Sequence, residues 1–188
     1  MRLTLVGFNI WEDTRLFQNQ CIHMYISLRI GLNLNVMVGL KFTITRLRTL
    51  VILTKRIQLR SKGEPDIIDI TDQALQAIKE CNIEKGLVTV FISGSTAAVT
   101  TIEYEPGLRD DFPEMLSRVA PENIPYKHDN TWHDGNGHSH VRASLIGPSL
   151  TIPIVDGKMT LGTWQQIVVL ELDTRPRNRN VILQLIGE

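Results

Sequence analysis

The sequence predicts an α+β fold: one strand-rich domain of sandwich-like mixed sheets with two helices. Short β-branched segments separated by turn residues recur from residue 51 to the C-terminus. Only two stretches have the spacing of helices, and strands and helices do not alternate as a parallel βαβ sheet requires. With 188 residues, one domain is expected. A domain of this size buries a core without disulfides or metals.

The first part of this domain is predicted to contain three strands and one helix. Apolar and polar residues alternate in the first strand, and the third is β-branched enough to be a central strand. Thr71 is a suitable cap for the helix, and Asp72 lies in its first turn, where the helix dipole favours an acid. The predicted elements are strands at 51–59, 66–70 and 87–92 and a helix from Thr71 to about Cys81.

The second part of the domain is predicted to contain six strands and one helix. Pro106 and Gly107 form a turn, and Pro113 is tolerated in the first turn of the helix that follows. Asp156-Gly157 between two apolar runs predicts a tight hairpin. The predicted elements are a helix at 110–119 and strands at 97–103, 140–146, 150–155, 159–161, 164–172 and 181–186.

Residues 1–50 differ from the remainder of the chain. They carry six Lys/Arg against two acids, whereas residues 51–188 carry fourteen against eighteen. Residues 26–40 alternate in hydropathy and predict a strand, yet no turn or capping residues organise their surroundings. We therefore predict an atypical N-terminal extension, with the hypothesis that translation begins near Leu50 or Val51. Recovery of peptides from residues 1–40 of the native protein would refute that hypothesis.

Composition excludes several classes of protein. The formal net charge is +0, which argues against nucleic-acid and membrane-surface binding. The apolar stretch at 24–40 contains Arg29, Asn33 and Asn35, so it is not a membrane span. The N-terminus lacks the pattern of a signal peptide. Only Cys21 and Cys81 occur, without metal-motif spacing, so a reduced, cytoplasmic protein is expected.

Histidine is concentrated in one segment. Four of the five histidines lie within HDNTWHDGNGHSH, namely His128, His133, His138 and His140. Imidazole is the commonest protein metal ligand, and it titrates near neutrality. If the segment is extended, residues 138 and 140 share one face, which suits two ligands on one strand. We expect a divalent metal site with these four as candidate ligands, zinc being favoured over magnesium. The alternative is a solvated loop.

Further polar residues are candidates for catalysis and binding. The expected catalytic set is His128, Asp134 and Glu103, although Glu103 is equally explained as a solvated strand end. Hydroxyl groups and turn amides suit phosphate, an indole suits a heteroaromatic ring, and a guanidinium binds phosphate with two hydrogen bonds. Each candidate also has a structural explanation as a turn, core or surface residue. The expected substrate-binding residues are Ser95, Thr96, Asn136, Trp164, Gln165 and Arg177.

Several strings in the C-terminal part resemble one family. They are Asn136-Gly137-His138-Ser139-His140, Gly147-Pro148-Ser149, Ile152-Pro153, Leu161 to Gln166 and Arg175-Pro176-Arg177. Together they resemble the YjbQ family, small proteins often labelled secondary thiamine-phosphate synthases, over residues 51–188. The family's Asn-x3-His matches Asn136 and His140, and its Gly-Thr-Trp-Gln matches Gly162 to Gln165. The family's histidine that precedes the Asn-x3-His motif matches His128.

The resemblance implies an α+β domain, commonly a homotrimer. It also implies an activity that joins a pyrimidine diphosphate to a thiazole phosphate with release of pyrophosphate. One departure stands out: many members have His-Thr-Ser/Thr-Ala where this chain has Gly94-Ser95-Thr96-Ala97, an archaeal-type variant. We hypothesise that His133 and His138 compensate for the missing imidazole.

Two other functions stay open from the sequence. One is a trimeric metal-binding protein whose synthase activity is incidental. The other is a metal-dependent hydrolase of phosphate or amide substrates. Turnover that needs the thiazole phosphate separates a synthase from a binding protein, whereas hydrolysis without this acceptor favours a hydrolase.

Overall fold

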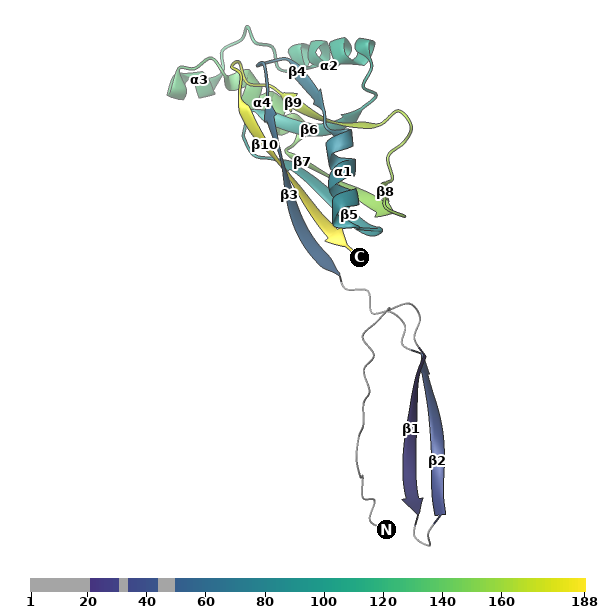
Figure 1. Ribbon diagram of the computed structural model, residues 1–188. Helices are drawn as coiled ribbons and strands as arrows, with labels where there is room; N and C mark the ends of the chain where they lie inside the picture. Colours follow the sequence, from purple (N-terminus) through teal and green to yellow (C-terminus); the bar gives the residue numbers. More distant parts are fainter. Residues whose placement is uncertain (1–20, 31–33, 44–49) are drawn as a thin grey trace. The chain divides into compact units, whose positions relative to one another are not determined.

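The structure, a computed structural model, describes residues 21–30, 34–43 and 50–188 (Figure 1). The chain divides into two units, Met1–Arg48 and Thr49–Glu188. In the first unit, strands β1 (Cys21–Ile30) and β2 (Leu34–Thr43) form an antiparallel hairpin. The alternating run at 26–40 therefore belongs to two strands, not one, and its residues 31–33 lie outside the described part.

The second unit contains two antiparallel sheets (Figure 1). The larger has the order β3-β10-β5-β7-β8, and the smaller has the order β4-β9-β6. This arrangement confirms the predicted α+β class. The strands of the larger sheet are β3 (Val51–Arg60), β10 (Asn178–Gly187), β5 (Lys85–Ile92), β7 (Ser149–Val155) and β8 (Lys158–Met159). Those of the smaller sheet are β4 (Asp66–Asp69), β9 (Gln166–Glu171) and β6 (Ala97–Ile102).

Four helices lie in the described part of this unit, two more than predicted: α1 (Thr71–Cys81), α2 (Pro106–Val119), α3 (Lys127–Trp132) and α4 (Gly137–Ile146). The prediction of a strand at 140–146 is wrong, because these residues belong to α4. The buried residues of this helix include His138, Ser139, Arg142 and Ala143. Their spacing is that of one helix face, and a strand would have buried every second residue.

Two helix starts also differ from the prediction. Thr71 does not cap α1: its hydroxyl donates to Asp69, and the same Asp69 oxygen accepts the Thr71 amide. Helix α2 begins at Pro106 because the Glu105 carboxylate accepts the amides of the second and third helical residues. Pro113 consequently lies inside the helix instead of in its first turn.

The core has two apolar layers separated by the smaller sheet. Ile167 and Val169 of β9 pack with α1 and the inner face of the larger sheet. Val168 and Leu170 point the other way and pack with residues of α2 and α4. Strand β9 is thus buried on both faces, which explains its continuous apolar run. Its end, where Glu171 and Asp173 are buried, lies beside the candidate site.

The Asp156-Gly157 hairpin is confirmed. Both residues have positive φ, 50° and 71°, and Val155 pairs with Lys158 across the turn. Two positive φ angles are the requirement of a type I′ turn, which Asp-Gly meets at low cost.

Candidate functional site

Helices α3 and α4 bring two of the four clustered histidines together. His128 is the second residue of α3, and His140 is the fourth residue of α4. Their ring centroids are 4.2 Å apart, with the planes inclined by 40°. The loop between the helices turns sharply at His133 and Gly135, where φ is 54° and 63°.

Gly137 allows the two helices to approach. A Cβ built at this position would lie 2.3 Å from the Cβ of Tyr126, closer than any real contact. The Gly137 amide donates to Asp129 Oδ1 at 2.9 Å, so a carboxylate of α3 holds the first residue of α4. An acid at a helix N-terminus is also favoured by the helix dipole. This short-range packing fixes His128 relative to His140.

The Nε2 atom of His128 is the clearest sign of a missing partner. Among buried side-chain nitrogen and oxygen atoms of the described residues, it alone has no hydrogen-bond partner. Asp134 Oδ1 lies 3.7 Å away, too far for a hydrogen bond. His128, Asp129 and Asp134 each offer one ligand atom, all within 4.8 Å of one another. A buried polar atom without a partner is costly, so a bound ion, water or substrate is expected here.

His140 is held in its neutral form. Burial, and then the neighbouring His128, lower its pKa, and the more weakly acting carboxylates of Asp134, Asp173 and Asp129 oppose this. A neutral imidazole has a free lone pair at pH 7. It can therefore bind a cation or accept a proton.

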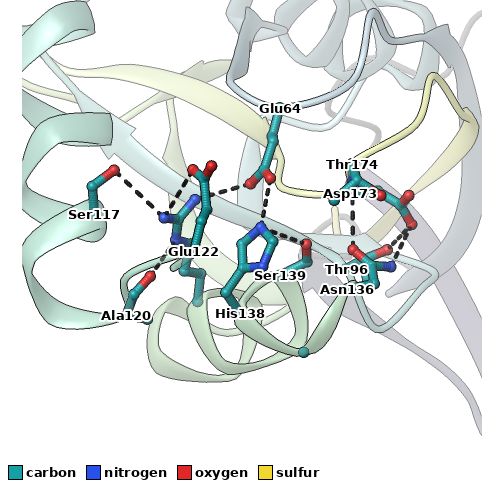
Figure 2. A network of polar contacts seen from close by, with 12 residues as sticks. Glu64, Thr96, Ser117, Ala120, Glu122, Asn136, His138, Ser139, Asp173 and Thr174 are labelled. Atoms are coloured by element: carbon teal, nitrogen blue, oxygen red, sulfur yellow. Dashed lines mark hydrogen bonds and ion pairs between the residues drawn. The ribbon is translucent and has the colours of Figure 1, made fainter. Parts of the chain in front are cut away.

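Asp173 joins three residues that the sequence marked as substrate-binding. Its Oδ2 accepts hydrogen bonds from Thr96 Oγ1 at 2.8 Å and Asn136 Nδ2 at 3.3 Å, as Figure 2 shows. Arg177 Nε lies 2.9 Å from the same oxygen. Burial alone would raise the pKa of Asp173, but hydrogen bonds, led by those from Arg177 and Thr96, lower it below its ordinary value. The carboxylate therefore stays ionised at neutral pH.

A buried ion pair lies next to this carboxylate. Arg179 and Glu171 are both buried, and the guanidinium meets both carboxylate oxygens through Nε and one terminal nitrogen. The same terminal nitrogen donates to Thr96 Oγ1 at 2.8 Å. The pair thus fixes Thr96, which in turn donates to Asp173.

His138 belongs to a different cluster. Its Nε2 lies 2.6 Å from Glu64 Oε1 (Figure 2). Arg142 holds the other oxygen of Glu64 at 2.9 Å. The expectation that residues 138 and 140 share a face was wrong because the segment is helical. Two residues apart on a helix, side chains point about 200° apart.

Three of the remaining candidates, Gln165, Trp164 and Glu103, lie toward the end of β6 that is far from Thr96. Gln165 donates to Thr101 near the end of β6, and Trp164 beside it is 71% exposed. Glu103, exposed, follows the same end of β6, whereas Thr96 precedes its start. Ser95 and His133 are exposed, and Ser95 adjoins Thr96.

The expected site residues did not include Asp173, Glu171 or Asp129. The string ELD at the end of an apolar strand, followed by three arginines, is the signal for the first two. Charged residues in a buried run need oppositely charged partners. Asp129 stands next to His128 but has no comparable signal.

Comparison with known proteins shows the family to which the chain is related. The family profile described as "UPF0047 protein YjbQ-like" matches residues 55–188. The chain belongs to this family. A UPF0047 protein of Archaeoglobus fulgidus is 38% identical over 130 residues, which are 69% of this chain and 98% of the relative. One of Methanothermobacter thermautotrophicus is 36% identical over 137 residues, covering 73% and 94%.

Solved structures of YjbQ-like proteins have a similar fold. A YbjQ-like protein of unknown function from Sulfolobus solfataricus has a TM-score of 0.71 at 29% identity, covering 74% of this chain and all of that one. An uncharacterised family protein from Clostridium acetobutylicum has a TM-score of 0.64 at 35% identity, covering 70% and 98%. No helix among the described residues is long and apolar enough to cross a membrane.

Proposed function

We propose that this YjbQ-like protein is a metal-dependent, thiamine-phosphate-synthase-like enzyme of the cytoplasm, with its site at His128, His140 and Asp134. The observation that carries the proposal is the buried, unpartnered Nε2 of His128 facing a carboxylate oxygen 3.7 Å away. Two ligands of one tetrahedral zinc ion, each bonded at about 2.1 Å, lie roughly 3.4 Å apart. A small side-chain movement brings the two atoms to that spacing.

The donor set fits zinc better than magnesium. An imidazole nitrogen and a carboxylate oxygen suit a borderline divalent ion, and the His140 ring adds a second imidazole. His133 and His138 are left out of the proposed ligand set. His133 is exposed, and His138 is engaged by Glu64.

The surrounding residues suit transfer to a diphosphate-activated carbon. In the proposed reaction the thiazole nitrogen forms the new C–N bond, the C–O bond breaks, and pyrophosphate leaves with the bonding electrons. A bound metal ion would neutralise charge on the leaving group. The exposed part of the Arg177 guanidinium can do the same, and Asp173 holds its Nε in place. This step removes no proton, so the distant Glu103 is not needed as a base.

Metal content tests the first part of the proposal. We expect stoichiometric zinc or another divalent ion in the untagged full chain, and its loss in His128→Ala and His140→Ala. His133→Ala is the matched control and should keep its metal, because His133 is exposed and is not among the proposed ligands. A wild type that stays metal-free after reconstitution would refute metal dependence.

Pyrophosphate release tests the second part. Release from the pyrimidine diphosphate that requires the thiazole phosphate supports the synthase. Release without the acceptor favours the hydrolase, for which His140, with its free lone pair, is the base to mutate. Metal binding without release favours a binding protein.

We also propose that copies of the chain assemble, as in the homotrimer that the resemblance implies. The larger sheet exposes apolar side chains on the face that points away from α1. Ile52, Ile186 and Leu87 form one cross-strand row there, and all are exposed. Light scattering should show an oligomer that Leu87→Asp dissociates, whereas Val119→Asp on exposed α2 is the control.

A further inference from the structure

The loop Ser93–Thr96 combines unpaired donors with an uncovered guanidinium. In the described chain, the backbone amides of Gly94, Ser95 and Thr96 have no acceptor. Arg179 forms its hydrogen bonds through Nε and one terminal nitrogen, so the other terminal nitrogen, NH1, is left without a partner. Among the described residues, the buried side-chain nitrogen or oxygen without a partner is His128 Nε2, so Arg179 NH1, which also lacks a partner, is accessible to solvent.

Gly94 is the residue that leaves this nitrogen open. A Cβ built on Gly94 would lie 2.6 Å from Arg179 NH1 and would meet little else within 4 Å. Any side chain here would therefore cover the guanidinium. The φ of +136° at Gly94 is also one that other residues rarely adopt.

The charges nearby favour an oxyanion. The guanidinium groups of Arg177 and Arg179 approach the same Asp173 oxygen, at 2.9 and 3.9 Å. Arg177 contacts that carboxylate through its Nε alone, and its side chain is 44% exposed. Two guanidinium groups with unpaired nitrogens and up to three backbone amides without acceptors are thus available around Thr96 and Asp173. Successive free amides with an arginine are a common way to bind phosphate.

We propose that Gly94, Ser95, Thr96 and Arg179 NH1 form a phosphate-binding subsite, open in this chain because residue 94 has no side chain. The subsite lies next to the histidines through Thr96 and Asp173. Only the identity of the compound that carries the phosphate rests on the proposed function. The subsite itself needs no metal.

The test uses the full chain, freed of metal by chelation, and inorganic phosphate. Calorimetry should show saturable binding, and the amide resonances of residues 94–96 should shift along the same titration. Gly94→Ala should weaken binding at least tenfold. Gly147→Ala is the matched control, since its φ is +99° and a Cβ there meets nothing within 4 Å.

Equal weakening in both glycine variants would assign the effect to backbone strain and overturn the subsite. If Gly94→Ala fails to fold, the wild-type amide shifts decide: shifts only outside residues 94–96, or none, overturn it. Acetate binding as tight as phosphate would overturn the phosphate assignment. Because the protein is metal-free, this test can fail while the metal proposal stands, and the reverse.

Discussion

Asp173→Asn should destabilise the protein by about 3 kcal/mol, a typical cost of breaking a buried, charge-assisted cluster. The wild-type carboxylate accepts from Thr96, Asn136 and Arg177 at one oxygen and from the Arg175 amide at the other. The asparagine side chain keeps one oxygen as an acceptor. Its NH2 group replaces the other oxygen and faces groups that themselves donate hydrogen bonds. Arg177 is half-exposed, so its share of the loss is small.

Thermal unfolding measures this loss. With an unfolding entropy of about 2.1 cal/mol/K per residue, a unit of this size should lose roughly 10 °C in Tm. Asp110→Asn is the control, because Asp110 is exposed. A shift for Asp173→Asn no larger than that of the control would refute the role given to this carboxylate.

The effect should also depend on pH. The folded-state pKa of Asp173 is lowered, so its stabilisation is present above the unfolded pKa and is lost as the pH falls through the folded value. The difference in stability between wild type and Asp173→Asn should therefore be full at pH 7. It should shrink below about pH 4, near the unfolded pKa of an aspartate.

Three further predictions follow from single contacts. His128→Ala should raise the pKa of His140 in metal-free protein, because His128 contributes to lowering it; an NMR titration measures this, and an unchanged value would contradict the assignment. Gly86→Ala should unfold the domain or lower its free energy of unfolding by several kcal/mol, since the new Cβ would lie 2.1 Å from a backbone oxygen of β10. Gly135→Ala is the control: its Cβ meets no atom within 4 Å, so the loss should be only about 1 kcal/mol. Chemical denaturation compares the two variants. Trp164→Ala should leave metal content unchanged, because Trp164 lies at the far end of β9 from Asp173; metal loss would disprove that separation.

The strands were predictable because their hydropathy pattern is local. The apolar run at 164–172 predicted β9, and Asp156-Gly157 predicted the hairpin between β7 and β8. Helix α4 was not predictable in this way, because its packing depends on Gly137 meeting Tyr126, a tertiary contact. The same error led to the wrong pairing of His138 with His140. Histidine density marked the candidate site, but the backbone decided which imidazoles meet.

The contacts of Asp173 predict different effects of Asp173→Asn and Gly94→Ala on phosphate and metal binding. Thr96 ties the phosphate loop to this carboxylate, and Asn136 ties the start of α4, which carries His140, to the same oxygen. Asp173→Asn should therefore weaken both phosphate and metal binding, because both elements lose a common anchor. Gly94→Ala blocks only the guanidinium edge and should weaken phosphate binding alone. If Asp173→Asn impaired one ligand and spared the other, the loop and the histidines would be independent sites, and a single catalytic centre would be ruled out.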